Sequence, residues 1–133
     1  MINYTDILRE HNLKVTPQRL AIVNELYSKR HINIESLYEL MMKKFDSISL
    51  ATIYKNINLM LESTLVQEVK IPNTKSVYEL TKESHSHLVC TKCLNVEDII
   101  IDLKTIENNV MDTNKFKINS TSLTLSGICK KCS

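Results

Sequence analysis

Several features are scarce in this 133-residue sequence, and each scarcity excludes a class of protein. Tryptophan is absent, and a chain with one glycine, Gly127, contains no glycine-rich phosphate-binding loop. No run of about 18 apolar residues occurs, so no segment is predicted to span a membrane. Residues 1–6 lack the basic and apolar regions of a secretory signal, and we therefore expect a cytoplasmic protein.

An excess of charge of one sign is also missing. Residues 1–70 carry nine Lys/Arg and eight Asp/Glu, and the remainder carries eight and seven, so each part has a net charge of +1. Bulk charge therefore does not indicate nucleic-acid binding. A DNA-binding protein of this composition must gather its basic groups locally.

The four cysteines form two Cys-x-x-Cys pairs, Cys90/Cys93 and Cys129/Cys132. Two such turns can complete a tetrahedral thiolate site for Zn²⁺. The alternatives are disulfides or redox pairs; a cytoplasmic chain disfavours disulfides, and one redox motif needs no matching second pair. The 35 residues between the pairs predict a structural zinc that ties the C-terminal tail to a small domain. Such a site contributes roughly 10 kcal/mol or more of folding free energy.

Helical spacing of apolar residues dominates the first half of the chain. A short helix is predicted at residues 4–11, a second begins behind the N-cap Thr16, and a third follows on another apolar stripe. Ser47 and Ser49 are candidate caps for a fourth helix over residues 50–63.

The pattern then changes to that of strands. Residues 65–71 and 76–80 predict a hairpin with its turn at 72–74, and helices followed by a hairpin indicate a winged helix-turn-helix. The rest of the chain predicts strands at 87–90 and 96–101, a helix at 103–113 and a strand at 115–126.

The predicted fourth helix has a polar face that suits DNA. Its N-terminal and outward side carries Ala51, Thr52, Tyr54, Lys55, Asn56 and Asn58. Recognition helices present such side chains to base edges and phosphates in the major groove. A polar helix face is also typical of plain solvent exposure, but the hairpin that follows favours DNA binding.

The predicted fold class is therefore α+β, an N-terminal winged helix-turn-helix followed by a small α/β dimerisation domain with structural zinc. We expect a winged-helix DNA-binding domain at residues 1–80, a hinge at 81–84, and the zinc-containing dimerisation domain at 85–133. A unit of about 50 residues is small to stand alone, so we expect it to dimerise.

Four segments together resemble the ferric uptake regulator (Fur) superfamily in order and spacing. They are LKVTPQR at residues 13–19, SISLATIYKN at 47–56, HSHLVCTKC at 85–93 and GICKKC at 127–132. The resemblance implies a homodimeric repressor that binds a pseudo-palindromic double-stranded DNA operator. It also implies that Tyr54 and Lys55 touch DNA and that Lys14 reaches the minor groove.

The complete set of predicted DNA-binding residues is Lys14, Arg19, Thr52, Tyr54, Lys55 and Asn56. Lys55 stands where many relatives of this family have arginine. Lysine has a single ammonium group in place of the planar guanidinium of arginine, which weakens the case for a bidentate contact with guanine at this position.

A second metal site is indicated by His85 and His87, which lie two apart on a predicted strand and therefore share one face. Cys90 would point to the other face, so the pattern favours two separate metals. The resemblance adds His31, Glu79 and Asp98 as ligands. Three imidazoles and two carboxylates make a regulatory site that suits Fe²⁺ or Mn²⁺ and can also take Zn²⁺.

This ligand set suggests a mechanism, because His31 belongs to the DNA-binding half and Glu79 ends the wing, whereas the other three ligands belong to the dimerisation half. A metal bound to all five would pin one half to the other. Pinning would set the separation of two recognition helices in the dimer, which must match two half-sites on DNA.

The resemblance leaves the signal open between branches of the family. Peroxide-sensing relatives carry aspartate at the position of Asp98, as here, and in them bound Fe²⁺ leads to oxidation of a ligand histidine; His31 and His85 match those positions. Ser84, Ser120 and Thr121 stand where iron-sensing relatives often have further histidines. We therefore predict a peroxide-responsive repressor, with an iron-responsive repressor of iron-uptake genes as the alternative. Zinc sensing is disfavoured because it commonly recruits an additional cysteine.

The sequence gives less support to two other classes of function, an enzyme and an adaptor protein. A catalytic zinc needs an open coordination position and a nearby general base, whereas four cysteines close the site. We therefore expect no enzymatic activity and no small-molecule partner other than peroxide as a signal. A zinc-stabilised adaptor without DNA binding is disfavoured by the Tyr54-Lys55 helix and the wing.

Overall fold

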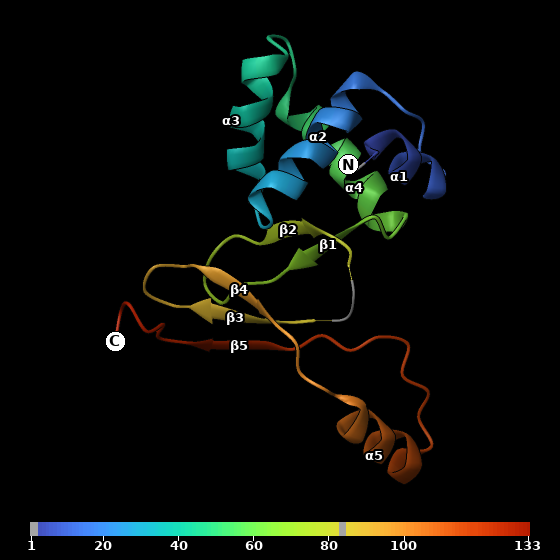
Figure 1. Ribbon diagram of the computed structural model, residues 1–133, viewed down its shortest axis with the longest axis vertical. Helices are drawn as coiled ribbons and strands as arrows, with labels where there is room; N and C mark the ends of the chain where they lie inside the picture. The colour runs from blue at the N-terminus through green and yellow to red at the C-terminus, as the bar shows by residue number, and fades with distance from the viewer. Residues whose placement is uncertain (1–2, 83–84) are drawn as a thin grey trace. The chain divides into compact units, whose positions relative to one another are not determined.

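The computed structural model describes residues 3–82 and 85–133, and the chain divides into two compact units, Met1–Thr81 and Lys82–Ser133 (Figure 1). Of the predicted hinge at 81–84, residues 83 and 84 lie outside the described residues, and the hinge and domain limits stay predictions. No helix in the described part of the chain is long and apolar enough to cross a membrane.

The N-terminal unit is a winged helix-turn-helix. Its elements are α1 (Tyr4–Glu10), α2 (Pro17–Lys29), α3 (Ile34–Lys44), α4 (Leu50–Glu62), β1 (Val66–Val69) and β2 (Val77–Leu80). Each helix starts at a side chain that accepts a backbone N–H of its first turn; the caps are Asn3, Thr16, Asn33 and Ser49. The predicted cap Thr16 is confirmed, and Ser49 rather than Ser47 caps α4.

The four helices enclose one apolar core, which confirms that most of the predicted stripes are core faces. Its fully buried side chains include Leu8, Ile22, Leu26, Leu37, Met41, Ile53, Ile57 and Met60. Packing of these stripes fixes the orientation of α4, because three of its core residues recur at helical spacing on one side.

Strands β1 and β2 form the predicted hairpin, with Val66 opposite Leu80 and Val69 opposite Val77. A third piece of extended chain joins them, because Ile32 and Tyr78 exchange backbone hydrogen bonds of 3.1 and 2.8 Å. This bridge connects the end of α2 to the wing.

The C-terminal unit contains β3 (Ser86–Cys90), β4 (Val96–Ile99), α5 (Lys104–Asn114) and β5 (Thr124–Gly127). The sheet order is β4-β3-β5; β4 runs antiparallel and β5 parallel to the central strand (Figure 1). The parallel pairing needs the long crossover that α5 provides.

The prediction of a strand over residues 115–126 is wrong for its first nine residues. Thr124 is opposite His87, near the start of β3, so earlier residues extend past the end of their only neighbouring strand in the described chain. Lys115 also has a left-handed φ of 54°, which breaks an extended path at the end of α5.

Candidate metal sites and DNA-binding face

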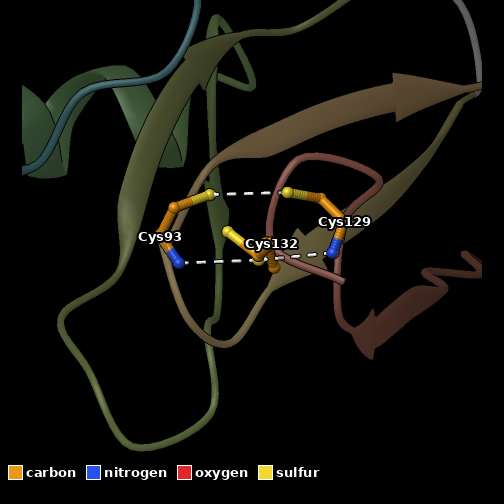
Figure 2. A group of neighbouring side chains, drawn as sticks. Cys93, Cys129 and Cys132 are labelled. Carbon is orange, nitrogen blue, oxygen red and sulfur yellow. Dashed lines mark hydrogen bonds between the residues drawn. The ribbon is translucent and has the colours of Figure 1, made fainter.

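The four cysteines gather where β3 and β5 end in the C-terminal unit. Cys90 ends β3, Cys93 lies in the turn toward β4, and Cys129 and Cys132 follow β5. Pairing of Cys90 with Gly127 in the parallel ladder brings the two cysteine pairs together. All four sulfur atoms lie within 4.8 Å of one another, and Figure 2 shows three of the side chains converging.

The chemistry of this cluster fits a structural Zn²⁺. All four cysteines are free thiols rather than disulfides. The backbone N–H groups of Cys93 and Cys129 donate to Cys90 Sγ at 3.5 and 3.4 Å, and these bonds lower the pKa of the Cys90 thiol to about 6. A hydrogen bond with the Cys129 side chain, followed by desolvation, raises the pKa of Cys132 to about 12. One thiolate is thus ready at neutral pH, and zinc would displace the remaining protons.

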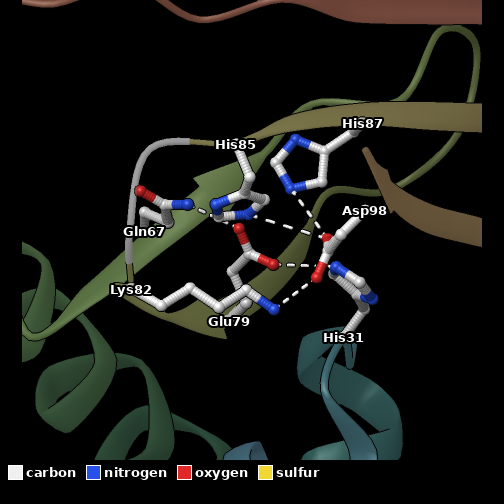
Figure 3. Close-up of polar contacts among 7 residues, drawn as sticks. All are labelled: His31, Gln67, Glu79, Lys82, His85, His87 and Asp98. Atoms are coloured by element: carbon white, nitrogen blue, oxygen red, sulfur yellow. Dashed lines mark hydrogen bonds and ion pairs between the residues drawn. The ribbon is translucent and has the colours of Figure 1, made fainter. Parts of the chain in front are cut away.

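In the N-terminal unit, two of the predicted regulatory ligands, His31 and Glu79, lie side by side. His31 Nε2 is 2.7 Å from Glu79 Oε2, and the Glu79 side chain is 1% exposed (Figure 3). The bridge between Ile32 and Tyr78 explains this proximity, because it aligns the residues next to each in sequence. Gln67, opposite Glu79 in the hairpin, donates its amide N–H to Glu79 Oε1.

In the C-terminal unit, the other three predicted ligands form a second group. Asp98 is opposite His87 in the β3–β4 ladder. Asp98 Oδ1 is 3.5 Å from Nε2 of His87 and 3.6 Å from Nε2 of His85, and the Lys82 ammonium contacts Oδ2 (Figure 3). Because side chains alternate along β3, His87 and Cys90 belong to opposite faces, as predicted.

Two residues around these ligands, Gln67 and Lys82, were not predicted from the sequence. The hairpin register that pairs Gln67 with Glu79 was a usable signal, since a turn centred at residue 73 places these two opposite each other. No sequence signal pointed to Lys82, because its contact with Asp98 depends on how the chain folds between them.

The predicted DNA-binding residues fall into two groups. Lys14, Tyr54 and Lys55 are exposed, Tyr54 to 45%, and Thr52 is partly exposed. Asn56 is only 8% exposed, and the half-buried Arg19 side chain donates to it. The side chains of the first group are open to solvent to different degrees, whereas those of the second group make hydrogen bonds within the protein.

Residues 10–126, most of the chain, match the sequence profile of the Ferric uptake regulator family. The chain belongs to this family. It shares the family's metal-dependent role in transcription regulation, which is not an enzymatic one. The Ferric uptake regulation protein of Bacillus subtilis (strain 168) is 36% identical over 132 residues, which cover 94% of this chain and 89% of that protein.

Peroxide regulators are similar as well. The Peroxide operon regulator of Bacillus subtilis (strain 168) is 30% identical over 130 residues, covering 96% of this chain and 90% of that protein. The crystal structure of the Campylobacter jejuni peroxide stress regulator superposes with a TM-score of 0.76 at 36% identity, covering 98% of this chain and all of that one. The relatives thus include both ferric uptake and peroxide regulators, and the family assignment does not select between these signals.

Proposed function

We propose that this protein is a homodimeric repressor that binds operator DNA when its regulatory metal is present and releases it after oxidation by peroxide. The observation that carries the proposal is the pairing of ligands inside each unit: His31 with Glu79, and His85 and His87 with Asp98. Each unit thus contributes a pre-assembled part of one five-ligand set.

The structural metal in this proposal is Zn²⁺ held by Cys90, Cys93, Cys129 and Cys132. Soft thiolates suit zinc, and a closed shell of four leaves no position for substrate. Its role is to fasten the residues after β5 to the turn between β3 and β4.

The regulatory metal would be Fe²⁺ or Mn²⁺, because three imidazoles and two carboxylates form a donor set of intermediate hardness. We propose that one ion takes ligands from both units. Binding then restricts the position of the winged helix relative to the dimerisation unit and favours the spacing that an operator demands.

The dimer in this proposal forms through the C-terminal unit. Ile100, Ile106 and Phe116 are 80%, 61% and 62% exposed in the single chain, which is a large apolar surface for so small a unit. The DNA surface consists of Lys14, Thr52, Tyr54 and Lys55, repeated by the partner at a second half-site of a pseudo-palindrome.

Peroxide is the proposed signal because aspartate occupies position 98 and Ser84, Ser120 and Thr121 replace further histidines. Bound Fe²⁺ supplies the redox chemistry that activates hydrogen peroxide. In the net reaction, an imidazole C–H of His31 or His85 gains one oxygen atom, and peroxide is reduced to water. The oxidised ring is a poorer ligand, so the ligand set fails and DNA is released.

An iron-responsive repressor of iron-uptake genes is the second candidate. Glu79 favours it, because peroxide-sensing relatives usually have aspartate there, and so does the 36% identity to the Bacillus subtilis ferric uptake protein. In that case loss of Fe²⁺, rather than ligand oxidation, would release DNA.

Mass spectrometry of the Fe²⁺-loaded protein after peroxide treatment separates the two candidates. Peroxide sensing predicts the added mass of one oxygen atom on a peptide containing His31 or His85, together with loss of DNA binding in fluorescence anisotropy. The Mn²⁺-loaded protein is the matched control and should gain no oxygen. DNA release without histidine oxidation, or with oxidation confined to cysteine, would contradict the peroxide proposal.

A further inference from the structure

Two residues predicted to bind DNA, Arg19 and Asn56, are linked to each other in a hydrogen-bonded chain within the N-terminal unit. Arg19 Nε donates to Asn56 Oδ1 at 3.0 Å. Arg19 Nη1 donates to the backbone carbonyl of Lys14 at 2.9 Å. Asn56 Nδ2 donates to the backbone carbonyl of Thr52 at 3.0 Å. The chain therefore runs from the segment before α2 to the first turn of α4.

We propose that Arg19 and Asn56 are positioning residues for DNA binding, which hold Lys14 and helix α4 in one fixed arrangement. Their bonds end on the backbone at Lys14 and Thr52, so they constrain where these residues lie without using their side chains. This inference rests on the proposed function, because it assigns the role of two side chains in the same DNA surface.

The burial of Asn56 argues for an internal role. It lies between Ile53 and Ile57 on the core side of α4 and is 8% exposed. Its amide oxygen accepts from Arg19 and its amide nitrogen donates to Thr52, so both ends of the amide are used. Reaching a base edge would break both bonds inside a largely buried site.

The shape of the guanidinium explains why arginine is needed at position 19. Its rigid planar fork directs Nε toward Asn56 and Nη1 toward Lys14 at the same time. A lysine ammonium keeps the charge but is a single point, and it cannot span these two acceptors in the same way. The segment that carries Lys14 lies between α1 and α2 and has no helix or strand of its own to fix it.

Anisotropy titrations of the full-length, metal-loaded protein test this assignment, with a labelled duplex that covers the promoter of its own gene. Arg19→Lys should weaken binding about tenfold, the effect of losing a charge-assisted hydrogen bond. The slope of log affinity against log salt should stay unchanged, because no phosphate contact is lost. Arg9→Lys, the same change at an exposed arginine of α1, should have no effect.

A direct phosphate contact by Arg19 gives the opposite pattern. Arg19→Lys would then keep most of the affinity, and Arg19→Gln would lower the salt slope by about 0.9, as one lost contact does. Either result overturns the inference. Failure of the wild-type protein to bind any duplex would instead refute the proposed function.

A double-mutant cycle supplies a second test through Asn56→Leu, which keeps the number and branching of the side-chain heavy atoms and removes both hydrogen-bonding groups of the amide. Positioning through one chain predicts that the losses caused by Arg19→Lys and Asn56→Leu are less than additive, because both variants lose the bond between Arg19 and Asn56. Additive losses would show two independent DNA contacts and overturn the inference. Circular dichroism establishes that the compared variants are folded at the assay temperature.

Nuclear magnetic resonance of the wild-type protein gives a test that needs no variant. The side-chain amide of Asn56 should keep its chemical shift when DNA is added, because its bonds to Arg19 and Thr52 persist. An intermolecular contact between this amide and a base would overturn the inference.

Discussion

At the scale of single residues, both carboxylates of the proposed regulatory site divide their oxygens between histidine and another donor. Glu79 faces His31 with Oε2 and accepts from Gln67 with Oε1. Asp98 faces two imidazoles with Oδ1 and the Lys82 ammonium with Oδ2. A neutral amide leaves the charge of Glu79 intact, whereas an ammonium partly neutralises Asp98 and competes with a metal for it.

Removal of the Lys82 charge should therefore tighten metal binding. We expect Lys82→Met to raise the affinity for Mn²⁺ by roughly threefold to tenfold, a modest effect because the lysine is 46% exposed and screened by water. Competition with a fluorescent chelator measures this affinity. Lys117→Met, at an exposed lysine outside the ligand groups, is the control, and equal affinities in all three proteins would contradict the expectation.

The sequence predicted some of these residue positions and not others, for physical reasons. The two-residue period of a strand was enough to place the side chains of His87 and Cys90 on opposite faces of β3. Asn56 was assigned to the outward face of its helix, but its spacing from Ile53 and Met60 is that of the core stripe. Because asparagine is polar, it was assigned to the exposed face, although helical periodicity alone would have placed it on the core side.

At the scale of elements, the chain has a single glycine, and other residues therefore occupy left-handed backbone conformations at helix ends and turns. Six non-glycine residues in the described part of the chain have left-handed φ angles; they are Asn12, Arg30, Thr64, Asn73, Leu94 and Lys115. Thr64 is the one β-branched residue among them, with φ of 66° directly after the C-cap Ser63 of α4. Helices commonly place glycine at this position.

Thr64→Gly should therefore stabilise the N-terminal unit. Relief of a left-handed conformation gains about 1–2 kcal/mol, and the greater freedom of unfolded glycine returns roughly 0.5–1 kcal/mol. We expect a net gain of about 0.5 kcal/mol in the free energy of unfolding by urea, followed by circular dichroism. Ser63→Gly, at a right-handed φ of −81°, should lower stability instead, and a destabilised Thr64→Gly would contradict this account.

The cysteine cluster joins the residues after β5 to the turn between β3 and β4, next to a β3–β5 ladder of four residue pairs. Cys93→Ser should lose zinc and, with it, a large part of the roughly 10 kcal/mol that such a site contributes. Metal analysis and size-exclusion chromatography should show a zinc-free protein that no longer dimerises. A stable, zinc-free dimer would refute the structural role of the cluster.

Helices were more predictable from the sequence than the last strand. The N-caps Thr16 and Ser49 mark the starts of their helices through local hydrogen bonds that a sequence encodes directly. The extent of β5 instead depends on the length of β3, which lies far away in sequence. Among the described residues, no strand pairs with residues 115–123.

At the scale of the whole molecule, the proposed ligands are distributed over two compact units, and in our proposal this distribution makes metal binding and DNA binding one linked equilibrium. His31 and Glu79 belong to the unit that carries α4, whereas His85, His87 and Asp98 belong to the unit that carries the zinc cluster. A metal that favours the DNA-competent arrangement must itself bind more tightly when DNA holds that arrangement.

The affinity for Mn²⁺ with and without saturating operator duplex tests this central claim most directly. Chelator competition on the zinc-loaded dimer should give a dissociation constant that is lower by roughly fivefold to 150-fold when the duplex is present. The same dissociation constant in both conditions would show that the regulatory metal and DNA do not communicate, and would contradict the account.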